Sequence, residues 1–385
     1  MEKTRFVSGL ATLSLTALFL LFGTISTDAI GLARSRNFDQ NTTGGNRLLP
    51  LGKPNSTAPQ VPDLLRPSTK EVTLTGLIPE GVVADAPVDL DGDGKTDFTV
   101  VRNTGGGASG QLTWFFALNG SGATGALNWG VNSDWVMTED FDGDGKDDIT
   151  VWRPGAGGTA AFYVFLSATS TIRIIQFGQT GDIPTVVADY DNDGKADPAV
   201  FRQGTPSIWY YQGSFNNPGG NVTAVAWGSN TDVPAPGDYD GDGKFDFGIY
   251  RNSGTGQLDF WRLLSNGTVM PVVRFGILAD IYAPGDYDGD NKTDIGTFRR
   301  SGGQTIWNWV SSVDGSTHSV AWGSGNDFPV QGDYDGDGKT DIAIWRPGVN
   351  PGESAFWAQL SSNGSLLVFQ WGLNGDFPAA SYNVF

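Results

Sequence analysis

The sequence predicts an all-β fold, a β-propeller of six four-stranded blades around a common axis. One reason is a nine-residue acidic pattern, Asp-x-Asp-x-Asp-x-Lys-x-Asp, that occurs six times. Its copies begin at Asp89, Asp140, Asp189, Asp238, Asp286 and Asp333. Successive copies are 47 to 51 residues apart, which is about the length of one blade. A second reason is that each interval contains four short segments with the character of strands.

The unit around the third acidic pattern shows these segments most clearly. Residues 184–190 are expected to form a first strand, residues 198–202 a second, residues 207–212 a third and residues 222–228 a fourth. Their lengths suit strands joined by hairpin loops. Every fourth segment ends in an aromatic residue followed by glycine, and these aromatic residues are Trp129, Phe177, Trp227, Phe275, Trp322 and Trp371.

The two ends of the repeat region predict how the ring closes. Residues 72–76 resemble a fourth strand, and residues 377–384 resemble a first strand without its acidic loop. We therefore expect pairing of the termini to seal the ring, since sealing removes exposed strand edges. A seventh blade remains an alternative if these segments and part of residues 30–70 build one more sheet.

The chain divides into three predicted parts. Residues 1–29 have the features of a signal peptide: Lys3 and Arg5, an apolar stretch over residues 6–22, and small residues up to Ala29. An uncleaved membrane anchor is the alternative. Residues 30–70 are rich in Asn, Thr, Ser and Pro and predict a disordered linker. Residues 71–385 form the propeller.

Composition narrows the choice of partners. The formal net charge is −18, and 37 of the 42 acidic residues are aspartate. Such a charge disfavours nucleic acid and anionic membranes as partners. The preference for the shorter carboxylate indicates tight loops rather than general surface acidity.

The acidic loops have the ligand spacing of a calcium site, because Ca²⁺ takes six to eight oxygen ligands. Aspartates at positions 1, 3, 5 and 9 and the backbone carbonyl of the lysine at position 7 are the predicted ligands. They are Asp89, Asp91, Asp93, Lys95 and Asp97; Asp140, Asp142, Asp144, Lys146 and Asp148; Asp189, Asp191, Asp193, Lys195 and Asp197; Asp238, Asp240, Asp242, Lys244 and Asp246; Asp286, Asp288, Asp290, Lys292 and Asp294; Asp333, Asp335, Asp337, Lys339 and Asp341. We expect up to six Ca²⁺ ions, about one per loop. Asn192 and Asn291, which replace glycine, tolerate left-handed backbone.

Two observations separate these loops from an EF-hand. Position 12 carries no glutamate, being Val, Ile or Thr in all six copies, and no helix is expected on either side. Acidic hairpins that bind nothing are the alternative, but four aspartates within nine residues would repel one another without a cation.

The order of these features resembles FG-GAP repeats and the related VCBS-type repeats. Trp227-Gly228 is followed by Asp232 and then by the acidic loop from Asp238, and Phe275-Gly276 is followed by an Ala-Pro-Gly segment. The resemblance covers residues 71–385. It implies a propeller similar to the integrin α-subunit head, with calcium loops on one face, and it implies no single activity.

A second repeated pair of residues lies at the other end of the predicted first hairpin. The second strands end in Arg102, Arg153, Arg202, Arg251, Arg299 and Arg346. The first strands are preceded by Asp134, Asp182, Asp232, Asp280, Asp327 and Asp376. We expect ion pairs such as Asp232 with Arg251. The alternative is a repeated pocket in which Arg and neighbouring Trp bind a sugar or an anionic group.

The sequence favours a non-catalytic protein. His318 is the only histidine and is expected on a surface loop, cysteine is absent, and no nucleophile elbow, phosphate loop or zinc motif occurs. We expect an exported calcium-binding module, secreted or at the cell surface. It would act in adhesion or bind an extracellular protein or carbohydrate as a monomer that is not inserted in a membrane once its signal is cleaved. A polysaccharide-active hydrolase or lyase is the alternative.

Overall fold

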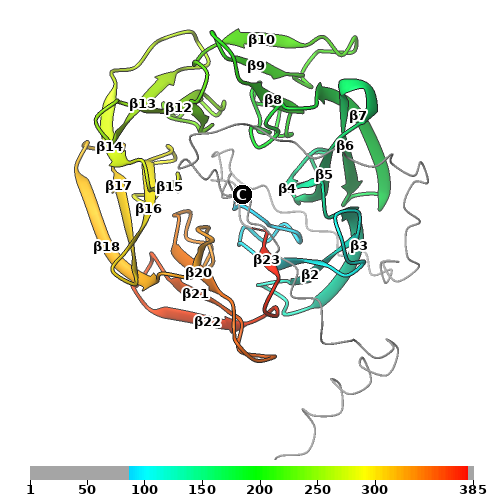
Figure 1. Ribbon diagram of the computed structural model, residues 1–385, viewed down its shortest axis with the longest axis vertical. Helices are drawn as coiled ribbons and strands as arrows, with labels where there is room; N and C mark the ends of the chain where they lie inside the picture. Colours follow the sequence, from blue (N-terminus) through cyan, green and yellow to red (C-terminus); the bar gives the residue numbers. More distant parts are fainter. Residues whose placement is uncertain (1–85, 380–385) are drawn as a thin grey trace, which may run out of the picture. The chain divides into compact units, whose positions relative to one another are not determined.

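The computed structural model describes residues 86–379, which form a ring of six antiparallel blades (Figure 1). This confirms the predicted all-β propeller. The expected signal peptide, the expected linker and the strand predicted at residues 72–76 lie outside the described residues. Within residues 86–379, the one helical element is the short 3₁₀ turn η1 (Ala156–Gly158), and no helix there is long and apolar enough to cross a membrane.

Each blade is a meander whose strands follow one another from the axis outward (Figure 1). The first strands are β23 (Phe377–Pro378) in blade 1, β4 (Trp135–Glu139), β11 (Val233–Pro234), β15 (Ile281–Tyr282) and β19 (Phe328–Pro329). The second strands are β1 (Phe98–Asn103), β5 (Asp148–Pro154), β8 (Ala199–Arg202), β12 (Phe247–Asn252), β16 (Ile295–Ser301) and β20 (Ile342–Arg346). The third strands are β2 (Gln111–Ala117), β6 (Thr159–Leu166), β9 (Ile208–Tyr211), β13 (Gln257–Leu263), β17 (Gln304–Val310) and β21 (Ala355–Gln359). The fourth strands are β3 (Thr124–Val131), β7 (Thr171–Gln179), β10 (Thr223–Ala226), β14 (Val273–Ile277), β18 (Thr317–Ser324) and β22 (Leu366–Gln370).

The first strands are shorter than the sequence suggested. In blade 3 the first strand is reduced to a bridge between Ile183 and Phe201, so the strand expected over residues 184–190 is wrong in its bounds. Pro184 has no N–H to continue the ladder. In contrast, β4 contains no proline and runs for five residues.

The ring closes by joining the two ends of the described chain in blade 1. Strand β23 pairs with β1 through Val101 with Phe377 and Val100 with Pro378. Nearer the acidic loop, the N–H of Asp97 donates to the carbonyl of Val88 at 2.9 Å. The first strand of blade 1 is thus made from both ends of the described chain, which confirms the predicted closure by pairing of the termini.

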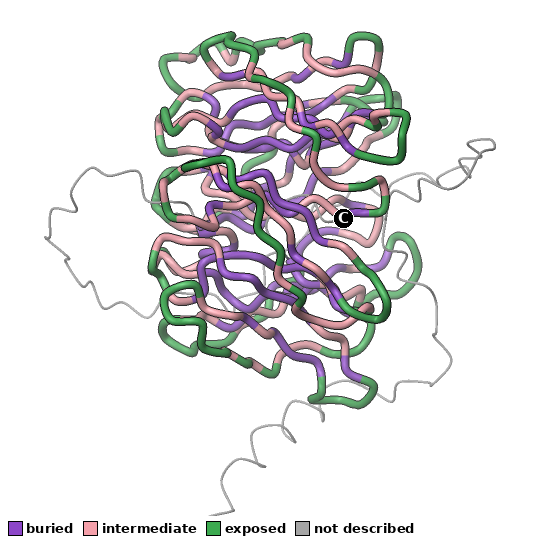
Figure 2. Tube along the Cα trace, turned by 90° about the vertical axis from the view of Figure 1, so that its left-hand side faces the viewer, coloured by how far each residue is buried: buried purple, intermediate pink, exposed green. Residues whose placement is uncertain are grey.

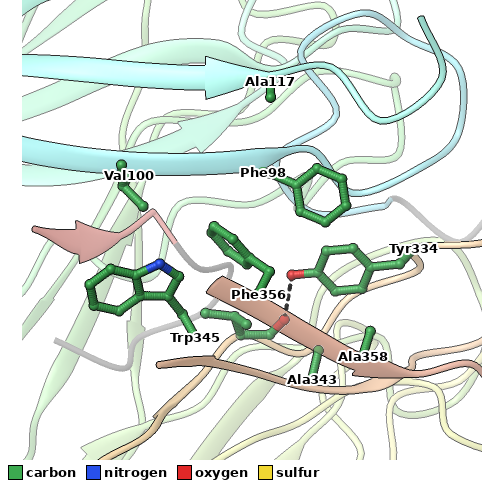
Figure 3. Close-up of a cluster of buried hydrophobic side chains, with 9 residues drawn as sticks. Phe98, Val100, Ala117, Tyr334, Ala343, Trp345, Phe356 and Ala358 are labelled. Atoms are coloured by element: carbon green, nitrogen blue, oxygen red, sulfur yellow. Dashed lines mark hydrogen bonds between the residues drawn. The ribbon is translucent and has the colours of Figure 1, made fainter. Parts of the chain in front are cut away.

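The core consists of six apolar clusters, one between each pair of neighbouring blades. Figure 3 shows the cluster that joins blade 6 to blade 1, where Phe98 contacts Tyr334 and Phe356. The Tyr334 hydroxyl donates to the carbonyl of Val330 at 2.8 Å, so no polar atom of this ring is left unpaired in the core. Burial is greatest in the second and third strands, whereas the fourth strands, such as β22, consist mostly of exposed and half-buried residues, as the loops do (Figure 2).

The tryptophans of the third strands occupy two different positions. Trp114, Trp209 and Trp307 are fully buried core residues, as expected. Trp261 and Trp357 lie one residue further along the register, opposite Ile249 and Ile344 of the second strands, and are half-buried. A shift of one residue turns a side chain to the other face of the blade. These two tryptophans therefore face the interface with the preceding blade.

Candidate metal centres

Each acidic loop is organised by the aspartate at position 1. In blade 4, the Asp238 carboxylate accepts hydrogen bonds from the N–H groups of Gly241 at 2.7 Å and Gly243 at 2.9 Å. The position-1 aspartates of the other loops accept from the same positions. The loop backbone therefore curls around one carboxylate.

This curl needs left-handed backbone at positions 4 and 6. Gly241 and Gly243 have φ of 80° and 81°, values that glycine adopts without steric cost. Asn192 and Asn291 stand at these positions in loops 3 and 5, with φ of 61° and 62°. The prediction that asparagine is accepted there is confirmed.

The aspartate at position 3 points an unpaired oxygen into most of the loops. In five loops at least one carboxylate oxygen at this position is buried and makes no hydrogen bond within residues 86–379. These oxygens belong to Asp91, Asp142, Asp191, Asp288 and Asp335. In Asp142 both oxygens are in this state. A buried carboxylate oxygen without a donor is unfavourable unless a cation occupies the space beside it.

The aspartate at position 9 is buried and fixed by two backbone N–H groups. Asp246 accepts from Tyr239 at 2.8 Å and from Ser265 at 2.7 Å, and the equivalent bonds occur in all six loops. Burial, together with the charges of the neighbouring aspartates, raises the pKa of Asp246 to about 7 and that of Asp197 to about 8. A cation in the loop would favour the ionised form.

The aspartate at position 5 is turned towards the loop between the third and fourth strands. There a serine hydroxyl donates to it, for example Ser265 to Asp242 at 2.9 Å. The other serines in this role are Ser167, Ser214, Ser312 and Ser361. Sequence reasoning missed these serines, although their recurrence within three residues of the end of each third strand from blade 2 onward was a usable signal. In blade 1, a Cβ at Gly120 would overlap the Asp93 carboxylate.

Three of the five predicted ligands come together as an oxygen cluster in each of loops 1 to 5, and in loops 1 to 4 the position-5 aspartate is not one of them. In loops 1 to 4, carboxylate oxygens from positions 1, 3 and 9 lie within 4.8 Å of one another, and in loop 5 those of positions 1, 3 and 5 do. A set of hard oxygen donors with an unpaired buried oxygen fits calcium. The position-7 carbonyls stay a prediction.

The six loops are joined to one another around the axis. The N–H at position 8 of each loop donates to the position-1 carbonyl of the loop before it, at 2.6 to 2.9 Å. These donor and acceptor pairs are Asp147 to Asp89, Ala196 to Asp140, Phe245 to Asp189, Thr293 to Asp238, Thr340 to Asp286, and Thr96 to Asp333. The last pair links blade 1 to blade 6, so the hydrogen bonds form a closed ring.

The loops surround a central cavity of about 440 Å³. It is lined by the position-1 aspartates of loops 1 to 5, by Glu139 and by lysines of position 7, including Lys146 and Lys195. Lys339 extends to the preceding loop and donates to the carbonyl of Asp288 at 2.9 Å. Lysine side chains thus place positive charge between neighbouring carboxylate clusters.

At the other end of the first hairpin, every predicted Asp and Arg pair is formed. Arg251 donates to Asp232 through Nε at 2.9 Å and Nη2 at 2.7 Å, and the other five pairs have the same two-point geometry. The Asp232 carboxylate also accepts from the N–H of Ser229 at 2.6 Å. The predicted ion pair is confirmed, and it holds the turn that leads into each first strand.

The isolated titratable residues lie outside the metal loops. His318 is exposed and lies in β18 rather than on the expected loop, where its ring stacks on Trp309 at 4.9 Å. Its backbone lies opposite that of Trp309 in the pairing of β17 with β18, and this pairing makes the residue part of the strand. Glu353 is exposed and accepts a hydrogen bond from Asn350.

A model of the FG-GAP-like repeat family matches residues 189–249, one complete unit from the third acidic loop into the second strand of blade 4. Together with the six-bladed ring, this match confirms an FG-GAP repeat propeller. Among proteins with curated descriptions, none matches the chain significantly.

Several solved structures are similar at low identity. TolB from Acinetobacter baumannii is 15% identical with a TM-score of 0.49, and the match covers 73% of this chain but only 65% of TolB. AofleA from Arthrobotrys oligospora is 9% identical over 77% of this chain and 90% of its own, with a TM-score of 0.44. A putative 6-phosphogluconolactonase from Bacteroides fragilis is 14% identical over 72% and 83% of the two chains, with a TM-score of 0.38.

Proposed function

We propose that this chain is an exported, calcium-stabilised propeller that binds an extracellular protein or carbohydrate and catalyses no reaction. One observation carries the proposal. The acidic loops hold clustered carboxylate oxygens, and in five of the loops the position-3 aspartate has a buried oxygen without a hydrogen-bond donor. Repetition of this arrangement around the ring indicates a purpose shared by all the blades.

The donor set favours calcium over transition metals. Each cluster offers carboxylate oxygens only, and the sequence contains no cysteine and one histidine. Oxygen-only sites suit hard cations, and Mg²⁺ demands a stricter octahedral geometry than a flexible loop provides. Six divalent ions would add twelve positive charges against a formal net charge of −18.

Calcium would act on stability, because each loop joins a first strand to a second strand and is bonded to the next loop. An ion that binds the folded ring and not the unfolded chain stabilises the ring by mass action. Metal-free loops would leave several carboxylates close together and uncompensated. The bound ions would therefore hold the inner hairpins in the geometry that supports the outer loops.

A binding role follows from where the carboxylates lie. The repeated aspartates are taken up by the acidic loops and by the ion pairs with arginine, which leaves the outer loops to carry specificity. The sequence features of residues 1–29 support export, and extracellular calcium sites of about 10⁻⁴ to 10⁻³ M affinity would be filled there.

Thermal unfolding of the full chain tests the metal assignment. The protein is stripped with chelator, and Ca²⁺ or Mg²⁺ is then added back. For a site with a Kd of about 10⁻⁴ M, 10 mM calcium adds about 2.7 kcal/mol. We expect a large rise in Tm that is specific to calcium. An unchanged Tm would overturn the proposal.

A matched pair of variants locates the effect. Asp142→Asn neutralises a loop carboxylate whose two oxygens are both unpaired, and it should remove one calcium from the stoichiometry measured by calorimetry. Asp259→Asn removes an aspartate of β13 that pairs with Arg274 outside the loops, and it should leave the stoichiometry unchanged. Equal losses in both variants would contradict the loop assignment.

A further inference from the structure

The loops that join third to fourth strands have exposed apolar side chains on one side of the ring only. Phe215 is 61% exposed and Val313 is 64% exposed. The complete set, which we name the apolar rim, is Phe215, Val222, Val269, Val272 and Val313. These residues belong to blades 3, 4 and 5, which are neighbours in the ring (Figure 1). Among residues 86–379, the other large hydrophobic side chains that are exposed lie in fourth strands or in loops of the opposite face, where the Asp and Arg pairs are.

The corresponding loops of blades 6, 1 and 2 have small or polar residues instead. Phe215 and Val313 each directly follow a serine whose N–H binds a position-9 aspartate. The equivalent places in blades 6, 1 and 2 are occupied by Ser362, Gly120 and Ala168. All six loops have the same metal-site pattern, so the metal sites do not explain why only one half of the ring is apolar here.

The apolar rim adjoins the carboxylates of the metal loops. The N–H of Phe215 donates to Asp191 at 2.8 Å, and the N–H of Val313 donates to Asp288 at 3.4 Å. Each nine-residue loop contains at least four aspartates and one lysine, so its formal charge without a cation is −3 or lower. A partner that fits this surface therefore combines apolar side chains with positive charge.

One segment of the chain itself has this chemistry. Residues 47–70, the basic segment, lie outside the described residues and contain four basic residues and one acidic residue, Asp63. Leucine lies close to a basic residue in two short clusters, Arg-Leu-Leu-Pro-Leu-Gly-Lys over residues 47–53 and Leu-Leu-Arg over residues 64–66. Residues 71–385 contain 16 basic and 38 acidic residues. The basic segment is therefore opposite in charge to the domain that follows it.

The basic segment is tethered on the same face as the metal loops. The described chain begins at Ala86, and the next residue, Pro87, lines the central cavity among the position-1 aspartates. The 15 residues between Lys70 and Ala86 can span up to about 50 Å. A domain of about 300 residues has a radius of gyration of about 19 Å, so this tether reaches any loop of the face. A flexible tether also gives the segment an effective concentration on the order of 1 mM, which favours it over a free partner of similar chemistry.

We propose that the basic segment docks on the apolar rim and the adjoining metal loops of its own chain. Its leucines would cover the exposed apolar side chains, and its arginines and lysines would lie against the loop carboxylates. Calcium in the loops would remove most of the negative charge and weaken the contact. The docking goes beyond the proposed function and needs no metal, whereas its weakening by calcium rests on the proposed metal role.

Energy transfer between two dyes on the full chain tests the docking. The chain contains no cysteine, so two introduced cysteines are the only sites that thiol dyes label. Ser56→Cys places one dye in the basic segment. Gly219→Cys places the other in a rim loop of blade 3, where an added Cβ meets no atom closer than 3.5 Å. The matched control combines Ser56→Cys with Thr169→Cys, an exposed position in the equivalent loop of blade 2.

In metal-free protein we expect transfer to the blade 3 label to exceed transfer to the blade 2 label by about twofold. A free tether that is attached in blade 1 would approach the neighbouring blade 2 at least as often. Salt at about 1 M should abolish the difference, because it shortens the Debye length to about 3 Å. Equal transfer to the two labels at low salt would overturn the docking.

Two sets of variants separate the apolar contribution from the charged one. Phe215→Ser with Val313→Ser copies the serine that blade 6 has at this place, and it should lower transfer to the blade 3 label to the control value. Arg47→Glu with Arg66→Glu should do the same. Val349→Ser replaces an exposed apolar residue of the opposite face and should change nothing. Transfer that is unaffected by the two serine substitutions would overturn the assignment of the rim.

Calcium and dilution separate the remaining outcomes. With calcium we expect the preference for the blade 3 label to fall while Tm rises. A chain that is stabilised by calcium but transfers equally to both labels when metal-free would refute the docking alone. A chain that docks when metal-free and gains no stability with calcium would refute the metal role alone. Transfer between chains that have one dye each would mean that the segment reaches a second copy, and it would overturn docking within one chain.

Discussion

Arg102 and Asp376 are separated by 274 residues and form the same two-point ion pair that joins Arg251 to Asp232 within one repeat unit. The Asp376 side chain is 1% exposed and that of Arg102 is 28% exposed. The pair therefore repeats the local bond of the other blades across the join of the ring. It fixes the turn before β23 where the last described strand enters blade 1.

Loss of this pair should open the ring more readily than loss of an equivalent pair inside a blade. Asp376→Asn leaves a mostly buried guanidinium without its partner, and we expect unfolding stability to fall by about 2 kcal/mol, less than for a fully buried pair because Arg102 is partly solvated. Asp232→Asn is the matched control in blade 4. Hydrogen exchange should show faster opening of β1 and β23 in the first variant. Equal exchange in both variants would contradict this role of the join.

Two of the second strands, β12 and β16, have a glycine as their second residue, and in both a backbone carbonyl oxygen lies where a Cβ would be. A Cβ at Gly296 would overlap the carbonyl oxygen of Ala283, the residue that directly follows β15. Gly296→Ala should therefore lower stability by about 2 kcal/mol or more, as measured by denaturant unfolding. Gly219→Ala is the control, since its added methyl would meet no atom closer than 3.5 Å. A neutral Gly296→Ala would show that the two strands can separate without loss.

Calcium binding should be coupled between neighbouring loops. The carbonyl of each position-7 lysine would bind the metal, and the N–H of the same peptide group, which belongs to position 8, donates to the preceding loop. A cation bound to that carbonyl would polarise the peptide group and so strengthen the hydrogen bond made by its N–H. We expect a Hill coefficient above one in calcium titrations, with a coupling free energy of about 0.5–1 kcal/mol between neighbouring loops. Asp142→Asn should lower both the stoichiometry and the Hill coefficient. Six independent and equal sites would argue against coupling.

The metal-free protein should lose stability as the pH rises. Burial raises the pKa of Asp97 from 3.8 to about 7, and the position-9 aspartates of the other loops are raised in the same direction. A raised pKa means that the folded state holds more protons than the unfolded state between the two values. The contribution of these aspartates to the free energy of unfolding is then fully present below about pH 4 and is lost as the pH rises through about 7.

Chelator-treated protein unfolded in urea at several pH values checks this sign. Calcium-loaded protein is the control, because the bound cations favour the ionised carboxylates and should reverse or flatten the slope. A metal-free stability that rises from pH 5 to pH 8 would contradict the burial of these groups.

Much of this fold follows from short-range patterns. The acidic loops fix the spacing of the blades, and the pairing of Arg251 with Asp232 was predictable because both residues flank the same hairpin. The loop backbone was also predictable from the residues at positions 4 and 6, since glycine and asparagine accept left-handed conformations.

The rest depends on contacts that a repeat pattern does not encode. The serines that bind the position-5 aspartates of blades 2 to 6, such as Ser265, recur in the sequence, but that they contact those aspartates is visible only once the third strand has brought its following loop beside the acidic loop. The distinction between the fully buried Trp307 and the half-buried Trp357 is a shift of one residue in register, which no periodicity of the repeat reveals. The ring of hydrogen bonds between loops arises only when six blades meet.

The placement of β23 in blade 1 has a consequence for how the protein is made. A chain that emerges from its N-terminal end can complete the strands of blades 2 to 6 in order, while β1 waits with an unpaired edge for residues translated some 270 positions later. During that interval the edge of β1 is open to strand exchange with a second nascent copy. Export of the chain in an unfolded state would shorten the time that β1 spends with an unpaired edge, because β1 and β23 would then cross the membrane in one translocation event before either strand folds.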